Sequence, residues 1–381
     1  MKSGRWRRYL DTIFTILISI LIFGLLIFIH ELGHYLFARI FKVTILEFSI
    51  GMGPKIVSYK SKKTGIVYAI SAIPFGGYVA MAGEERPTDE PPVAGQYGSV
   101  DVPQAQESLE SDPNTFDKKP AWQRLIITVA GAAMNLLAGF TVMIIYTSLS
   151  TVLIGSTTVA DFPTNAGKDY NASTQGIIES GDRIIKVNGK SVSIYDELSY
   201  EIMRGGNKPV DLTVVRDGEE ITLDDVVFPT VGEQGQVLGV IDFRVYRAEK
   251  DIGTVMKYSL LKGVLLVRMC WESLFDLITG RYSLQAVSGP VGISGAIGDA
   301  AKIGIEPLLY IAALISINLG VMNLLPIPAL DGGRTLTTLI EMITRKKLPP
   351  KVENAINAVG LVLLLGLSFI ILIKDVLQLI I

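Results

Sequence analysis

Histidine and cysteine are scarce in this chain of 381 residues, which contains two histidines and one cysteine. The single cysteine, Cys270, excludes an intrachain disulfide framework, so the redox compartment cannot be inferred from it. A strong basic charge is also absent, because the formal net charge is −2. Proteins that bind nucleic acids are usually clearly basic. We therefore expect no nucleic-acid partner.

Apolar residues are abundant, by contrast. The chain is 49% hydrophobic and 19% charged, which is too apolar for an ordinary soluble protein. Four stretches are long enough to cross a bilayer, which takes roughly 20 apolar residues. They are residues 12–29 (continuing as helix to about 41), 125–154, 307–328 and 355–373. We expect a polytopic α-helical membrane protein with about four transmembrane helices, embedded in the lipid bilayer.

The first apolar stretch does not match a plain cleaved signal peptide. Its apolar run exceeds the roughly 7–15 residues of such peptides, and no small-residue cleavage site follows it. A further apolar segment, residues 251–282, carries charges at helical spacing and is predicted to be an amphipathic helix in the membrane interface. A helix packed on a soluble domain is the alternative. The charged residues are Lys257, Lys262, Arg268, Glu272 and Asp276.

The segments between the apolar stretches differ in character. Residues 43–83 contain β-branched and aromatic runs broken by Gly and Pro, which indicates strands and turns. Residues 84–119 are acidic and rich in Pro, which predicts a flexible loop. Residues 160–248 contain short apolar runs separated by turns such as "NGK" and "RDGEE", which predicts a small domain of hairpins with one helix near 194–203. The membrane segments are then 1–42, 120–156, 305–333 and 353–381.

Lysine and arginine near the membrane ends predict the orientation. The larger basic group lies on the side that carries Arg39, Lys118 and Arg334, and we place that side in the cytoplasm. The basic N-terminus, with Lys2 and Arg5, disagrees with this assignment. On this basis the small domain at 160–248 is extracytoplasmic.

The two histidines lie four residues apart in "HELGH", at the end of the first apolar stretch. On a helix this spacing places His30 and His34 on one face, one turn apart, where two imidazoles can chelate one zinc ion. Glu31 lies beside them and can act as general base on a water molecule at that ion. Two solvated histidines are the alternative. Ionisable residues beside a membrane core are costly and usually functional, so we expect one Zn²⁺.

A catalytic zinc usually has three protein ligands. No third histidine exists, and Cys270 lies in the interfacial segment, so we expect a carboxylate. Asp331 in "NLLPIPALDGG" is the candidate; Pro326 and Pro328 should end the helix, and Gly332 with Gly333 would allow a tight turn. A helix-terminating turn with a solvated aspartate is the alternative.

The number of membrane crossings between His30 and Asp331 favours Asp331 as a zinc ligand. His30 and Asp331 follow the first and third spans, so they share a membrane face only if residues 251–282 do not cross. Asn135 and Asn323 also lie inside spans, where a buried amide needs a partner. Either could bind substrate, which we favour for Asn323, or could hydrogen-bond between helices, with Gly131 and Gly139 permitting close packing.

These motifs, in this order, resemble the site-2 proteases, which are intramembrane zinc metalloproteases. "HELGH", "GAAMN" and "NLLPIPALDGG" carry the resemblance, and "GMGPKI", "AIPFGGYVAMAGE" and "SGPVGI" extend it to the bacterial RseP/RasP type. "ESGDRIIKVNGKSV" is similar to a PDZ domain, although the approach to it, "AGKDYNASTQGIIESGD", departs from the usual pattern. Only one such domain fits.

The resemblance implies a membrane-associated β-hairpin region at 43–83 and zinc ligands His30, His34 and Asp331. It also implies that Glu31 is catalytic and that Asn323 helps to bind substrate. The implied substrates are single-pass transmembrane proteins, such as anti-sigma factors already trimmed outside by another protease, in a bacterial plasma membrane. A zinc transporter and an inactive scaffold are the rival hypotheses. Two histidines at one depth argue against the transporter, and the intact His-Glu-x-x-His pattern argues against the scaffold.

Overall fold

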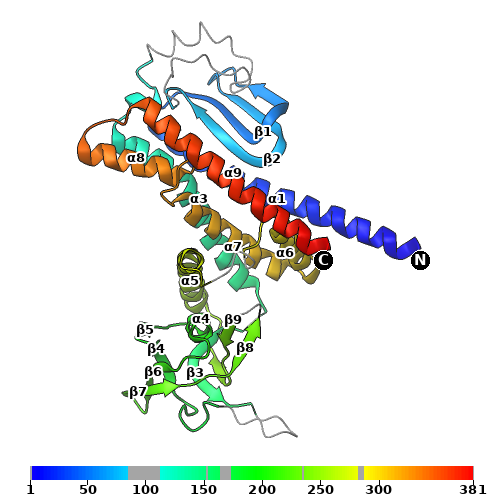
Figure 1. Ribbon diagram of the computed structural model, residues 1–381, viewed down its shortest axis with the longest axis vertical. Helices are drawn as coiled ribbons and strands as arrows, with labels where there is room; N and C mark the ends of the chain where they lie inside the picture. The colour runs from blue at the N-terminus through cyan, green and yellow to red at the C-terminus, as the bar shows by residue number, and fades with distance from the viewer. Residues whose placement is uncertain are drawn as a thin grey trace. The chain divides into compact units, whose positions relative to one another are not determined.

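The computed structural model describes residues 2–84, 112–151, 153–163, 173–233, 236–281 and 287–380 (Figure 1). The chain divides into two compact units. One comprises Met1–Val142 with Met269–Ile381, and the other comprises Met143–Arg268. The predicted loop at 84–119 lies mostly outside the described residues, since 85–111 are not among them.

Four helices of the described chain are long and apolar enough to cross a membrane. Their apolar segments are Leu10–Ile40, Ala121–Leu149, Ile305–Asn323 and Lys351–Gln378. The helix built from residues 252–278 is not one of them, which is the condition that the parity argument requires. The helices are α1 (Lys2–Ile40), α3 (Ala121–Leu149), α7 (Ile305–Asn323) and α9 (Pro350–Ile380).

The third span is shorter than predicted. The helix α7 ends at Asn323 rather than continuing toward 333, and residues 324–330 connect it to α8 (Asp331–Thr344). The prediction that Gly332 and Gly333 form a tight turn is wrong, because both residues are helical and buried in the first turn of α8. A Cβ on Gly332 would lie 1.8 Å from the carbonyl oxygen of Leu325. The glycines therefore let α8 pack directly on the connecting segment.

Small residues hold α1, α3 and α7 together. A Cβ on Gly33 would lie 2.4 Å from the carbonyl oxygen of Ala130, so α1 and α3 touch backbone to backbone. A Cβ on Gly139 would lie 2.5 Å from Cγ1 of Ile317, and the Ser316 hydroxyl donates to the Asn135 carbonyl oxygen at 2.7 Å. Helices without a hydrophobic driving force between them associate through such close contacts.

The two long strands after α1 are bent. Strands β1 (Ile45–Lys60) and β2 (Val67–Met81) pair antiparallel, and Phe48 has partners in both halves of β2, Val79 and Tyr68. The first half of β1 therefore lies between the two halves of β2. Positive φ values at Gly51 and Gly76 permit the bends, because residues with a Cβ rarely adopt this conformation.

The bent sheet packs on α1. The Phe48 ring stands edge-on to Phe28 and Tyr35 of α1, with centroids 6.0 and 5.4 Å apart. The described end of the predicted loop is also held in place, since Thr44 donates to the Asp112 carboxylate at 2.6 Å and the 3-10 turn η1 (Phe116–Lys118) follows. Residues 112–119 are thus part of this unit, in contrast to the flexible loop predicted there.

One shorter helix contacts the spans at another point. Helix α6 (Pro290–Ile303) begins against α9, where the backbone N–H of Gly292 donates to the Asp375 carboxylate at 3.0 Å. A Cβ on Gly298 of α6 would lie 2.4 Å from the Thr15 hydroxyl of α1. These contacts tie the ends of α1 and α9 to α6.

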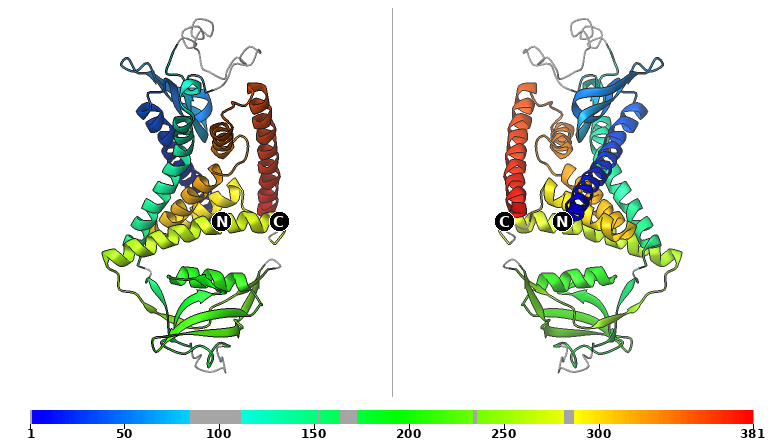
Figure 2. Two further views of the ribbon diagram at one scale, coloured as in Figure 1. Left: turned by 90° about the vertical axis from the view of Figure 1, so that its left-hand side faces the viewer. Right: turned by 90° about the vertical axis from the view of Figure 1, so that its right-hand side faces the viewer.

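The second unit contains a curled sheet whose strand order is β10-β3-β4-β6-β7 (Figure 2). Its strands begin at Gly155, before the predicted start at 160, and the second span ends at Leu149 rather than continuing to 156. Helix α4 and an apolar core that includes Leu198, Ile202 and Leu212 cover the sheet. The elements are β3 (Gly155–Asp161), β4 (Arg183–Val187), β5 (Lys190–Ser191), α4 (Tyr195–Gly205), β6 (Val210–Arg216), β7 (Glu219–Val226), β8 (Thr230–Glu233), β9 (Gln236–Gly239), β10 (Arg244–Arg247) and the first part of α5 (Ile252–Ile278).

Candidate active site

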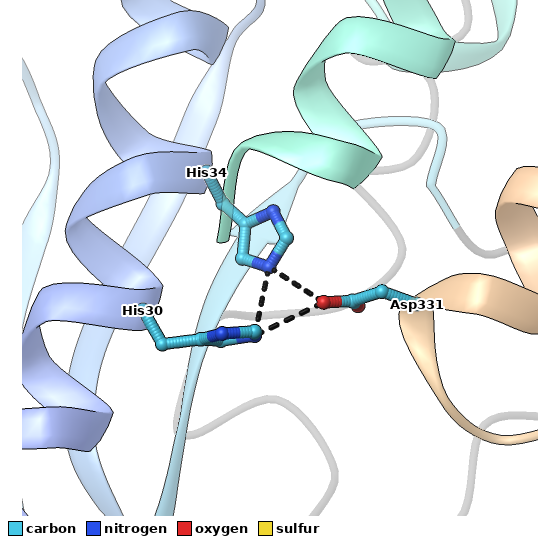
Figure 3. A group of neighbouring side chains, drawn as sticks. All are labelled: His30, His34 and Asp331. Atoms are coloured by element: carbon cyan, nitrogen blue, oxygen red, sulfur yellow. Dashed lines mark hydrogen bonds and ion pairs between the residues drawn. The ribbon is translucent and has the colours of Figure 1, made fainter. Parts of the chain in front are cut away.

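His30, His34 and Asp331 come together at one point, although roughly 300 residues separate the histidines from the aspartate along the chain (Figure 3). Both imidazoles project from the same face of α1, as the spacing of four predicts. Asp331 is the first residue of α8. Its Oδ2 atom lies 3.0 Å from Nε2 of His30 and 3.2 Å from Nε2 of His34, and the two Nε2 atoms are 3.2 Å apart.

The chemistry of these three atoms fits a cation. Nδ1 of His34 donates to the Ile127 carbonyl oxygen at 2.8 Å, so the neutral ring has its lone pair on Nε2. That lone pair faces a carboxylate oxygen. Oδ2 of Asp331 is itself buried, with no hydrogen-bond donor in suitable geometry among the described residues. Acceptors that converge in this way need a positive charge between them, and two imidazoles with a carboxylate form a donor set that zinc prefers.

The Asp331 carboxyl is ionised at neutral pH. Burial would raise its pKa, but the two imidazoles, when they are protonated in the absence of a metal ion, donate to the carboxylate and lower the pKa below its ordinary value. An ionised carboxylate is the form that can bind a metal ion.

Both intramembrane asparagines approach Nδ1 of the His30 ring, whereas Nε2 of the same ring faces Asp331. The Asn135 amide nitrogen lies 3.2 Å from Nδ1 of His30, and the Asn323 amide nitrogen lies 3.5 Å from the same atom. The Asn135 amide oxygen is buried without a partner. Rotating this amide by 180° would let the oxygen accept from Nδ1–H, as a metal-bound histidine requires, because the two ends of the amide are similar in size.

Glu31 is buried, with 8% of its surface exposed, and lies beneath the β2 strand. A Cβ on Gly77 would lie 3.0 Å from Cγ of Glu31 and 2.9 Å from the Ser49 carbonyl oxygen. Only a residue without a side chain lets the strand come this close to the glutamate. The strand and the predicted general base are therefore neighbours.

Sequence reasoning assigned no site role to Gly131, which contacts both imidazoles. A Cβ at this position would lie 2.3 Å from Nε2 of His34 and 2.8 Å from Cε1 of His30. Its spacing of four from Asn135 matches the spacing of the histidines, and this shared face could have indicated its place. An ion pair between Glu84 and Arg334 was also missed. It joins the segment after β2 to the first turn of α8, and two residues so distant in sequence give no local signal.

The chain matches known proteins over nearly its whole length. The family model for peptidase family M50 matches residues 18–367. A relative from Clostridium acetobutylicum that is named for zinc metalloprotease activity is 35% identical over 366 residues, which is 95% of this chain and 97% of the relative. The zinc metalloprotease RasP of Geobacillus kaustophilus is 30% identical, covering 96% of this chain and 98% of its own.

The regulator of sigma-W protease RasP from Bacillus subtilis is 29% identical over 422 residues, which is 95% of this chain and 98% of that protein. The extent of these matches agrees with four membrane-crossing helices and with a donor set suited to zinc. The chain belongs to peptidase family M50, the site-2 proteases, and is a membrane zinc metalloprotease.

Proposed function

We propose that this protein hydrolyses a peptide bond in or near the transmembrane segment of single-pass membrane proteins, with His30, His34 and Asp331 as the zinc ligands. The observation that carries the proposal is the convergence of two Nε2 atoms and one carboxylate oxygen within 3.2 Å of one another. The parity of the spans supports it, because His30 lies in the second half of the first span, Leu10–Ile40, and Asp331 follows the third.

Glu31 is the proposed general base. A bound zinc ion would lower the pKa of a water molecule and polarise the scissile carbonyl group. The Glu31 carboxylate accepts a proton from the attacking water and delivers it to the amine nitrogen that leaves. Its burial beneath β2 keeps this carboxylate away from bulk solvent. The Asn135 amide holds the His30 ring in orientation, and Asn323, at the end of α7, is left to contact the substrate backbone.

The substrate binds as an extended strand in this proposal. A helical substrate hides its peptide bonds, so it must unwind before cleavage. The half of β2 that contains Gly77 pairs with β1 on one side and passes over Glu31. Its other side offers a strand edge, and strand addition there would hold the scissile bond beside the glutamate. Exposed apolar residues of the sheet, such as Ile56 and Ile73, support its association with the membrane.

The substrates are transmembrane proteins already trimmed outside the membrane, such as anti-sigma factors, and the product is a released cytosolic fragment. The name of the Bacillus subtilis relative supports this substrate class. With the larger group of Lys and Arg residues in the cytoplasm, the site lies near the cytoplasmic side of the bacterial plasma membrane.

Wild type and Glu31→Gln should be compared in liposomes, with bound zinc and cleavage of a trimmed single-pass substrate as the two readouts. We expect both proteins to retain zinc and the variant to lose cleavage by at least 10²–10⁴-fold, about the contribution of a general base. His34→Ala is the control that loses both. If wild type and variant both retain zinc, neither cleaves, and zinc crosses the liposome membrane, the alternative of a zinc transporter replaces the protease.

The domain at 160–248 is proposed to be PDZ-like, extracytoplasmic and a filter against substrates with bulky ectodomains. Its ends adjoin, because the backbone N–H of Ala248 donates to the Ile154 carbonyl oxygen at 2.8 Å. Residues 155–247 can therefore be replaced by a short linker. The deletion variant should cleave untrimmed substrates, and strict selectivity in that variant would refute the filter.

A further inference from the structure

Helix α8 has an apolar face that no described part of the protein covers. Leu336, Leu339, Ile340 and Ile343 recur at helical spacing on one side of the helix, and each is between 39% and 82% exposed. Ile343 is the most exposed at 82%. These four residues form the α8 stripe. A helix on the surface of a soluble protein turns its apolar side toward the protein, so α8 has the opposite arrangement.

The polar side of α8 is the side that packs on the protein. Glu341 forms an ion pair with Arg124 of α3 at 2.6 Å, and only 14% and 6% of these side chains are exposed. Thr338 is buried, and Gly332 packs on the connection from α7. Glu341 thus finds its partner inside the unit, and the α8 stripe faces outward.

The position of α8 in the chain places it at a membrane face. It follows the end of the span α7 by seven residues, 324–330, and ends before the span α9 begins. Figures 1 and 2 show its direction: in Figure 1 α8 is seen from the side while α9 descends obliquely, and in Figure 2 α8 is seen end-on. It therefore runs at an oblique angle to α9 rather than parallel to it.

Positive charge gathers at the end of α8. Arg345, Lys346 and Lys347 directly follow its last residue, and all three are exposed. The Lys347 ammonium donates to the Asp117 carbonyl oxygen at 2.8 Å, which leaves its charge uncompensated by that contact. Anionic phospholipids attract basic residues beside a membrane-bound helix. An apolar stripe joined to a basic end is the pattern of a helix that lies in the membrane interface.

We propose that α8 docks on the bilayer surface, with the α8 stripe among the acyl chains and Arg345, Lys346 and Lys347 on anionic phospholipid headgroups. The consequence for the site is direct, because Asp331 is the first residue of this helix. The lipid surface would hold the helix that carries Asp331 against His30 and His34. The docking itself does not depend on the protease activity and is measured without it.

The test uses a nitroxide at Ile343→Cys in the full-length protein carrying Cys270→Ser, which removes the only native cysteine. Accessibility to oxygen and to a water-soluble nickel complex is recorded in nanodiscs of phosphatidylglycerol or of phosphatidylcholine. Val362→Cys, 68% exposed on α9, is the lipid control, and Lys208→Cys, exposed in the second unit, is the water control. Ile343 is so exposed that its replacement should leave the fold intact.

In phosphatidylglycerol the label at 343 should match the lipid control, with high oxygen and low nickel accessibility. Changing Arg345, Lys346 and Lys347 together to Gln should weaken the docking equilibrium on the order of a hundredfold, and phosphatidylcholine should act in the same direction. A match to the water control would overturn the proposal. Low accessibility to both reagents would also overturn it, because protein would then cover the stripe. Equal immersion in both lipids and in the triple variant would refute the role of the headgroups.

Discussion

Adding one methyl group at Gly131 should disable the site without unfolding the protein. In Gly131→Ala the new Cβ would lie 2.3 Å from Nε2 of His34, whereas ordinary contacts begin at 3.4 Å. The ring must therefore retreat by about 1 Å. Its retreat is opposed by the hydrogen bond from Nδ1 to the Ile127 carbonyl oxygen and by the backbone contact between Gly33 and Ala130.

A shift of this size is large for a metal site. Ligand distances are held to about 0.2 Å, and a misplacement of about 1 Å can lower the rate by about 10²-fold. We expect Gly131→Ala to bind zinc 10–100-fold more weakly, the range found when the support of a ligand is removed, and to lose at least about 10²-fold in kcat/KM. Helix propensity acts in the opposite direction, because alanine favours a helix over glycine by about 1 kcal/mol.

The assay is zinc competition against a chelator, with thermal unfolding measured in parallel. Gly139→Ala is the matched control on the same helix, since its Cβ would press on Ile317 of α7 rather than on a histidine. That control should lose stability and retain zinc affinity. If Gly131→Ala binds zinc as tightly as wild type and cleaves within twofold of it, the imidazoles are not held as the structure indicates.

Three further outcomes follow from contacts around the site. Asn135→Ala should weaken zinc binding 10–100-fold by removing the partner of Nδ1 of His30, whereas Asn135→Asp retains an acceptor and should retain affinity; equal affinities by chelator competition would count against this. Glu84→Gln should lower kcat by loosening Arg334 and the first turn of α8, and exchanging the two charges, with Arg at 84 and Glu at 334, should restore part of the loss. Tyr78→Pro and Val79→Pro remove donors that point to opposite sides of β2. One of the two prolines removes a donor on the side of β2 that pairs with β1, and the other removes a donor on the free side. The variant on the free side should keep its thermal stability and its zinc but lose cleavage, and unchanged cleavage in that variant would contradict strand addition.

The membrane helices could be predicted because their signal is local. Uncharged runs of about 20 residues have few alternatives to a span, and the order of spans then brings His30 and Asp331 to one membrane face. The spacing of the histidines also predicts a shared helix face, as observed. What remained open was whether the carboxylate of Asp331, the predicted third ligand, is solvated. The structure places it against both rings, which no periodicity in the sequence could have indicated.

Other features could not be predicted because they depend on partners distant in the chain. Gly332 and Gly333 favour a turn in isolation, yet the bare backbone they provide is used to pack α8 on Leu325. The β-branched stretch near Gly155 looks like the end of a long apolar helix, but pairing with β10 makes it a strand. Gly131 reads as a helix-packing residue until the imidazoles that it faces are known.

The ligands of the proposed zinc site come from α1 and α8, and α3 supports them through the Ile127 carbonyl oxygen. A metal ion bound there would act as a cross-link that closes a loop of roughly 300 residues, and long loops are where such a closure restricts the unfolded chain most. Zinc would then be part of the scaffold as well as of the chemistry. Metal removal should lower the unfolding temperature of the unit that comprises Met1–Val142 and Met269–Ile381. It should loosen α8 first, because that helix is joined to the site through its first residue.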